Sequence, residues 1–205
     1  MQHRTALRLL AALLAVKLLL HFRLNGSWSF HRDELLYLAL GRHLDWGYAS
    51  VPAGIGFWAW FGDTVLGGSV WAIRLIPTLF GVATVLLTGL MAKEMLWDKS
   101  SGRAVSPGNF AMLLIGLSGL TCGAFLRPCM MFQPVVFDIF YWTLLCWLFL
   151  KYLNTEKTSW LLWFGVVAGL GLLNKYSVLI LLFGMSAGLL LAGPRRIFSQ
   201  KQLYV

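Results

Sequence analysis

Residues 70–91 read VWAIRLIPTLFGVATVLLTGLM, a long apolar run in which Arg74 is the one charged side chain. A helix needs roughly 17–25 mainly apolar residues to cross the hydrocarbon core of a bilayer. Every backbone polar group in that core has to be bonded within the protein, and a helix does this by itself. The run therefore predicts a membrane-spanning helix, and it decides the fold class.

The composition of the whole chain agrees with this prediction. Of 205 residues, 59% are hydrophobic and 12% are charged, and the mean hydropathy is +0.72. A soluble domain has too little polar surface at this composition, and a disordered chain needs low hydrophobicity and high charge. Ten Trp and fourteen Phe fit aromatic belts at a lipid boundary. Both soluble and disordered classes are excluded.

Five further apolar segments bring the predicted number of spans to six. They cover residues 6–22, 110–125, 135–152, 160–173 and 177–192. A more polar loop, residues 25–69, separates the first two spans and holds half of the acidic residues of the chain. We therefore expect an all-α polytopic membrane protein, with residues 1–205 forming a single transmembrane domain.

The net charge of +9 comes from 17 basic and 8 acidic residues. The Lys and Arg residues punctuate the apolar runs and form no basic stripe, so we expect no nucleic-acid partner. With the N-terminus inside, the inner segments carry ten basic residues and the outer segments five. The positive-inside rule then predicts that both termini are cytoplasmic and that the 25–69 loop is outside.

The first loop contains a short helical pattern with two acids at its start. Residues 30–40 suit a helix lying in the membrane interface, and Asp33 and Glu34 fall in its first turn. Their charge there stabilises the helix dipole, which is a structural role. Adjacent side chains point about 100° apart on a helix. If one acid is a general base, we expect the other to pair with Arg32, His31 or a backbone group.

Aromatic residues follow a turn predicted at residues 47–54. Phe57, Trp58, Trp60 and Phe61 would dip back into the interface as a second interfacial element. A loop that is acidic at one point and aromatic elsewhere suits a reaction on a lipid-borne head group.

Three more charged residues lie at the predicted outer ends of spans: Arg127, Asp138 and Lys175. Charges near membrane depth are costly and are therefore functional candidates. They also have structural readings, because Asp138 and Lys175 complement helix termini and Arg127 can snorkel to head groups. Together with Asp33 they provide two anions and two cations, a fair receptor for a phosphodiester and a proton acceptor.

Two groups inside the spans have a structural interpretation. Lys17 and His21 lie one turn apart and could line an internal cavity, although packing or snorkelling is the preferred reading. Cys122, Cys129 and Cys146 show no CxxC spacing, so we expect structural thiols. Clustered carboxylates permit a divalent metal, but no ligand set has a defining spacing.

Four stretches of the sequence carry a resemblance. The loop residues FHRDELLY (30–37) and GRHLDWGY (41–48), followed by Pro52, resemble the first outer loop of bacterial GT-C glycosyltransferases. The nearest group is similar to the protein O-mannosyltransferases and the lipid A aminoarabinose transferases. The other stretches that agree are SVWAIRLIP (69–77), FQPVVFD (132–138) and GLGLLNKYS (169–177).

The resemblance implies an inverting membrane glycosyltransferase of the bacterial plasma (inner) membrane. Its donor would be a polyprenyl-phosphate sugar, and its acceptor an extracytoplasmic protein or glycolipid. Asp33 matches the acid that acts as base or orients the acceptor, and Glu34 matches the second acid of that motif. Asp138 matches an acid that faces the same cavity, and Lys175 a cation near the donor phosphate, for which Arg127 is a second candidate.

Departures from the family pattern leave alternatives open. The aminoarabinose transferases have a lysine just before the loop proline, whereas Val51 precedes Pro52 here, so the sugar is not assigned. Family members are considerably longer, so we expect a chain truncated at its C-terminus after the sixth span. The alternatives are an inactive fragment, a partner subunit, or a small transporter, although the long acidic and aromatic loop does not suit a transporter.

Overall fold

The structure, a computed structural model, describes residues 2–98, 100–101, 103–104, 108–193 and 195–201. The helices in this part of the chain are α1 (Gln2–Leu24), α2 (Arg32–Gly41), α3 (Ala53–Thr64), α4 (Val70–Met95), α5 (Asn109–Thr121), α6 (Gly123–Cys129), α7 (Pro134–Thr155), α8 (Ser159–Asn174) and α9 (Val178–Ala192). Two antiparallel strands of two residues each, β1 (Trp97–Asp98) and β2 (Arg103–Ala104), follow α4. The 3-10 helix η1 (Arg195–Ser199) follows α9. The predicted all-α class is confirmed.

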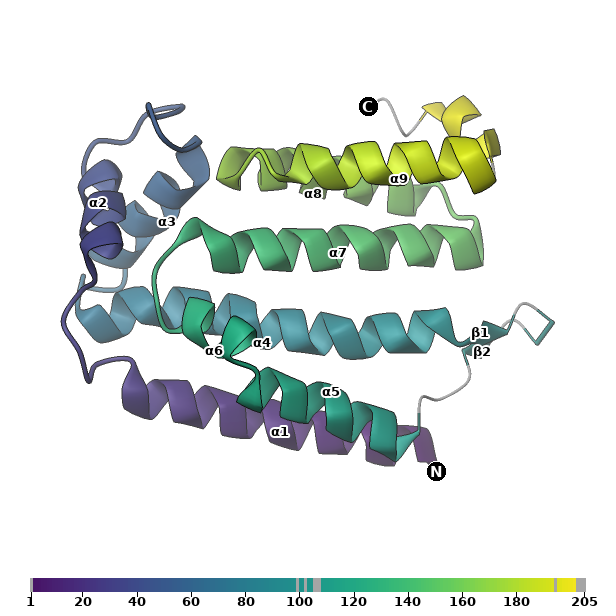
Figure 1. Cartoon of the computed structure of the whole chain (residues 1–205), viewed down its shortest axis with the longest axis horizontal. Helices are drawn as coiled ribbons and strands as arrows, with labels where there is room; N and C mark the ends of the chain where they lie inside the picture. The colour runs from purple at the N-terminus through teal and green to yellow at the C-terminus, as the bar shows by residue number, and fades with distance from the viewer. Residues whose placement is uncertain (1, 99, 102, 105–107, 194, 202–205) are drawn as a thin grey trace.

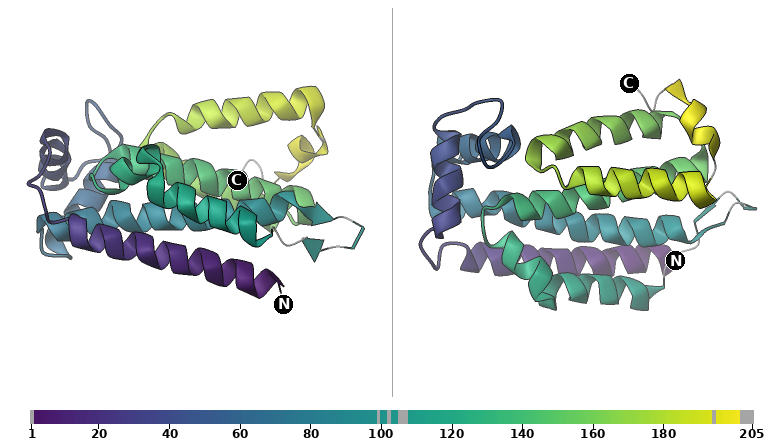
Figure 2. Two further views of the ribbon diagram at one scale, coloured as in Figure 1. Left: turned by 60° about the horizontal axis from the view of Figure 1, so that its bottom comes forward. Right: turned by 45° about the horizontal axis from the view of Figure 1, so that its top comes forward.

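The long helices lie side by side, and α2 and α3 lie across one end of them (Figure 1). The first turn of α1 and the helix η1 are found toward the opposite end. Helix α4 packs against α7, α7 against α8, and α1 against both α5 and α4. Helix α9 stands apart from the other helices in the left view of Figure 2, and its apolar side chains are largely exposed, Leu191 by 84%.

Three described helices are long and apolar enough to cross a membrane: Thr5–Leu24, Val70–Met95 and Pro134–Thr155. Helices α5 and α6 form a fourth candidate if they are one bent span, and α8 and α9 are apolar but shorter. The protein is therefore a multi-pass membrane protein. The count of six spans stays a prediction, and the predicted C-terminal end, residues 202–205, lies outside the described residues.

The predicted span at residues 110–125 stays a prediction; in this region the helix breaks at Cys122 and resumes as α6 with a bend of 56°. A break leaves the last carbonyl groups of α5 without helical partners. The buried Lys17 ammonium donates a hydrogen bond to one of them, Gly119 O, at 2.8 Å. Lys17 therefore packs inside the bundle and holds the end of α5, as the packing interpretation predicted.

The main apolar core lies between α3, α4, α7 and α8. Phe132, Phe137 and Ile73 are fully buried there. This core attaches α3, and with it the α2–α3 end, to the spanning helices.

Small residues allow α5 and α4 to approach closely elsewhere in the bundle, as is usual in membrane proteins. A Cβ on Gly119 of α5 would lie 2.6 Å from Val85 of α4.

Candidate active site at the α2–α3 end

Helix α2 begins with a reciprocal cap. The backbone N–H of Asp33 donates to His31 Nδ1 at 3.3 Å, and the backbone N–H of His31 donates to Glu34 Oε2 at 2.8 Å. This is the capping box, with His31 in the position usually held by Ser or Thr. Two of the orphan donors at the start of α2 are thereby satisfied. The predicted helix over residues 30–40 is confirmed, with bounds shifted by one or two residues.

Glu34 is fully buried and completely hydrogen-bonded. Its Oε1 accepts from Arg74 Nε at 3.0 Å and from the backbone N–H of Phe132 at 2.9 Å. Its Oε2 accepts from Arg74 Nη2 at 2.7 Å and from His31. Burial by itself raises the pKa of the Glu34 carboxyl, but these hydrogen bonds and the Arg74 charge outweigh burial, so the pKa lies below its ordinary value.

Arg74, in the first turn of α4, uses all five of its N–H groups. Besides the two bonds to Glu34, Nη1 donates to the carbonyls of Asn25 (2.9 Å) and Trp28 (3.0 Å), and Nη2 donates to that of Ser29 (2.8 Å). The pair therefore fixes the link between α1 and α2 as well as the start of α2. Sequence reasoning missed this role, although a lone charge in an apolar run was a signal for it.

Asp33 is the more open neighbour, with a side chain 38% exposed. Gln133 Nε2, from the link before α7, donates to its Oδ2 at 3.2 Å, and Arg32 Nε donates to Oδ1 at 3.3 Å. These contacts are long, His31 Nδ1 lies 3.8 Å from Oδ2, and Arg32 is itself 90% exposed. Because its contacts are few and long, the Asp33 carboxylate keeps free lone pairs at the surface. Tyr37 lies one turn further along α2, and its pKa is raised, first by burial and then by the charge of Asp33.

Asp138 and Lys175, two predicted site residues, lie together. Lys175 Nζ is 3.7 Å from Asp138 Oδ2, and Ser177 Oγ donates to Asp138 Oδ1 at 2.6 Å. The Asp138 side chain is 13% exposed and that of Lys175 45%. The pair connects the first turns of α7 to the link between α8 and α9. Asp138 also lines a cavity of about 470 Å³ that includes Thr88 of α4.

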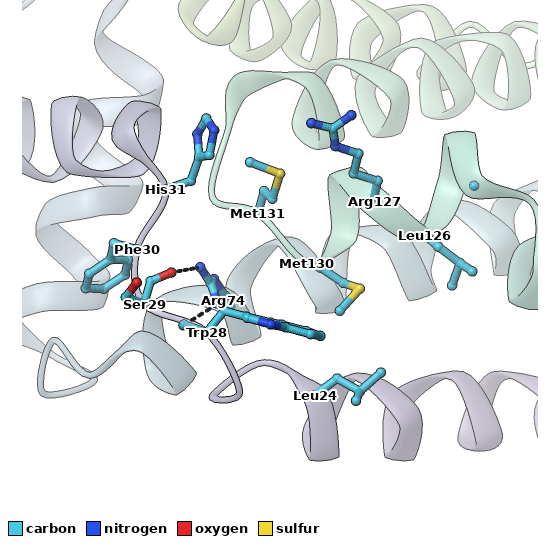
Figure 3. A pocket seen from close by; sticks show the side chains of 11 residues that line it. Leu24, Trp28, Ser29, Phe30, His31, Arg74, Leu126, Arg127, Met130 and Met131 are labelled. Atoms are coloured by element: carbon cyan, nitrogen blue, oxygen red, sulfur yellow. Dashed lines mark hydrogen bonds between the residues drawn. The ribbon is translucent and has the colours of Figure 1, made fainter.

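Arg127, the fourth predicted charge, lies elsewhere at this end. It lines a cavity of about 540 Å³ together with Arg74 and His31 (Figure 3). In the part of the chain that the structure describes, no hydrogen bond or ion pair joins Arg127 to Asp33 or to the Asp138–Lys175 pair. The hydrogen bonds and ion pairs of the described residues therefore join Asp138 to Lys175 but do not link all four predicted charges.

The described residues contain no cluster of potential metal ligands and no disulfide. No group of three or more His, Cys, Asp or Glu side chains among them could hold a metal ion. The three cysteines are free, and Cys129 Sγ donates to the carbonyl of Phe125 within α6. Cys129 is buried between α4 and α6, which fits the predicted structural role.

The architecture defines a multi-pass helical membrane protein with a charged site at the end that carries α2 and α3. A family model described as dolichyl-phosphate-mannose-protein mannosyltransferase matches residues 50–205, and the chain belongs to this family. It is therefore a membrane glycosyltransferase of the type that uses a lipid-linked sugar. The match includes Arg74, Asp138 and Lys175, whereas Asp33 and Glu34 precede it. Neither a curated protein nor a solved structure matches the chain.

Proposed function

We propose that this protein transfers a sugar from a polyprenyl-phosphate donor to an extracytoplasmic protein or glycolipid, with Asp33 as the general base. The observation that supports this most is the contrast between two adjacent acids. Glu34 has four hydrogen bonds and no exposed surface, whereas Asp33 is 38% exposed and only loosely bonded. A base has to reach the proton that it removes, and of these two acids Asp33 is the one placed to do so.

The proposed reaction is an inverting displacement at the anomeric carbon. Asp33 accepts the proton of the acceptor hydroxyl or amine as the acceptor atom bonds to that carbon. The bond from the carbon to the phosphate oxygen breaks, and its electron pair leaves with the lipid phosphate. A cation beside that phosphate stabilises the charge that develops on it.

Lys175 is the proposed cation for the donor phosphate. Its ammonium is 3.7 Å from Asp138 and 45% exposed, so it keeps donors for a second anion. Asp138 would then hold Lys175 in position, supported by Ser177. The alternative candidate, Arg127, lines a separate cavity, and its contact with the donor stays a prediction. Glu34 is better suited to position Asp33 than to react, because all of its acceptor sites are filled.

The proposed location is the bacterial plasma (inner) membrane, with both termini in the cytoplasm. The first turn of α1 and helix η1 share the end opposite α2 and α3, in support of this topology (Figure 1). The α2–α3 end would then face the extracytoplasmic side, where a lipid-linked donor and its acceptor meet.

The test is transfer of labelled sugar from a panel of polyprenyl-phosphate donors in membranes that contain this chain. Asp33→Asn should lower transfer by about 10²–10⁴-fold, the usual size of general-base catalysis. Asp63→Asn is the matched control, since Asp63 lies in the same loop, is 39% exposed and, among the described residues, forms an ion pair with Arg42 alone. This control should retain activity.

Three results would contradict the proposal. Normal transfer by Asp33→Asn would remove Asp33 from the reaction. Absence of transfer by the unaltered chain with every donor, despite correct insertion, would favour an inactive portion or a partner subunit. Binding of a solute without any lipid donor would favour a transporter.

A further inference from the structure

The cavity beside the Glu34–Arg74 pair is not used by the proposed reaction. It has a volume of about 540 Å³, within the usual range for small-molecule sites. It lies between the end of α1, the start of α4, helix α6 and the two links that contain residues 28–31 and 130–131 (Figure 3). Its apolar walls consist of Leu24, Trp28, Phe30, Leu126, Met130 and Met131.

The two arginines of this cavity differ in their free donors. Arg74 spends every N–H on protein acceptors and is a fixed part of the cavity wall. Arg127 is exposed, and its guanidinium makes no hydrogen bond or ion pair with any residue that the structure describes. A guanidinium presents its donors in a planar fork that matches a phosphate group. Arg127 therefore offers an unused phosphate ligand at the cavity.

The place of the cavity points to a membrane lipid. The cavity lies at the end of α1, which is Leu24, and beside the last turn of α6, which holds Arg127. Trp28, which also lines it, is 60% exposed. An exposed Trp at the end of a helix is typical of the zone where acyl chains meet head groups, and a guanidinium in that zone meets the lipid phosphates. Apolar walls below a free cation suit one anionic head group with the upper part of its chains.

We propose that this cavity binds an anionic glycerophospholipid of the surrounding membrane, with Arg127 as the ligand of its phosphate. Asp33, Asp138 and Lys175 do not line the cavity, so a lipid held there would not present a sugar to the candidate base. Its role would instead be to order the two links. Residues 28–31 are separated from Asp33 by Arg32 alone, and residues 130–131 directly precede Phe132 and Gln133, which bond to Glu34 and Asp33.

The experiment is native mass spectrometry of the purified full chain in detergent, with phosphatidylglycerol or phosphatidylcholine added at equal concentration. We expect phosphatidylglycerol to bind the unaltered chain at least about tenfold more tightly than phosphatidylcholine. Arg127→Gln should reduce this preference to near unity. Arg127→Lys should keep part of it, because it retains the charge and loses the fork.

Two further variants separate a built site from general surface charge. Gly123 lines the cavity, and a Cβ there meets nothing within 4 Å, so Gly123→Phe should fold, keep Arg127 and obstruct the lipid. Arg42→Gln removes an exposed guanidinium that pairs with Asp63 at the same end of the molecule, and it should leave the preference unchanged. Circular dichroism of each variant checks that the helices are intact.

Several outcomes would overturn the proposal. Equal binding of the two phospholipids to the unaltered chain would do so, and so would an unchanged preference in either Arg127→Gln or Gly123→Phe. A third arm adds undecaprenyl monophosphate. If this lipid displaces phosphatidylglycerol at a small fraction of its concentration, the cavity holds the lipid carrier and not a phospholipid. None of these readings depends on sugar transfer.

Discussion

Two charged regions lie at the same end of this molecule and differ in how their charges are used. In the closed region, Glu34 and Arg74 are buried, and every donor and acceptor of the pair is bonded. In the open region, Asp33 and the Asp138–Lys175 pair keep exposed surface. The hydrogen bonds of Asp33 with Gln133 and Arg32 and the Asp138–Lys175 contact are 3.2–3.7 Å long, although Ser177 bonds Asp138 at 2.6 Å. A saturated buried charge can only hold structure, whereas a partly bonded one at the surface can still bind or accept a proton.

The closed region positions the open one. Glu34 bonds to His31 of the first link, to Arg74 of α4 and to Phe132 of the link before α7. Asp33 and Gln133, which contact each other, are the chain neighbours of Glu34 and Phe132. The buried pair therefore sets the distance between the two segments that meet at the candidate base.

The largest predicted effect is loss of the buried pair. Glu34→Gln leaves the Arg74 guanidinium buried without its counter-charge, and we expect it to lower the free energy of unfolding by about 3–5 kcal/mol. The same isosteric change one residue earlier, Asp33→Asn, should cost less than about 1 kcal/mol. Denaturant unfolding in detergent measures both. Equal effects of the two substitutions would contradict the distinction between the regions.

Acid pH should weaken the closed region next. The folded pKa of Glu34 lies below its ordinary value of 4.5, so its stabilisation is complete above that value and is lost as the pH falls through the folded pKa. The melting temperature of the unaltered protein should therefore fall below about pH 4. Glu34→Gln should fall less steeply over this range. An identical acid profile for the two proteins would show that Glu34 does not titrate as inferred.

A smaller effect is expected from the open pair. Lys175→Gln should raise the KM for the lipid-linked donor by about tenfold, with less change in kcat, because one charge-assisted hydrogen bond to the phosphate is lost. Lys157, which is exposed at the turn between α7 and α8, provides the control Lys157→Gln. If Lys157→Gln has the same effect as Lys175→Gln, the effect reflects net charge and not a site.

The smallest effect should come from the exposed pair of Arg42 and Asp63. Its side chains are 70% and 39% exposed and lie 3.6 Å apart. Exposed pairs contribute little, so Arg42→Gln should change the free energy of unfolding by less than about 0.5 kcal/mol. A cost comparable to that of Glu34→Gln would mean that burial is not what separates strong pairs from weak ones here.

The sequence predicted several of these elements because their signals are local. An apolar run of roughly 17–25 residues indicates a membrane-spanning helix without any knowledge of its tertiary contacts, because a helix of that length crosses the bilayer core. The start of α2 was readable because two acids fall in its first turn, which is a local signal; the His31 cap was not predicted. The sequence also predicted that, if one of those acids is a general base, the other pairs with Arg32, His31 or a backbone group; Glu34 bonds to the backbone N–H of His31, and the role of Asp33 as base stays a proposal. Asp138 and Lys175 were each identified as costly charges, but not as partners.

What the sequence by itself determined is the class of protein, the approximate spans and the set of charges worth examining. Only the tertiary structure decided how those charges are used, since Glu34 and Arg74 are 40 residues apart and Asp33 and Gln133 are 100 apart. The contact that accompanies the break at Cys122 was equally non-local, because Lys17 of α1 donates to the carbonyl of Gly119 near the end of α5. Burial and long-range hydrogen bonds depend on which helices pack together, and local sequence patterns do not encode that packing.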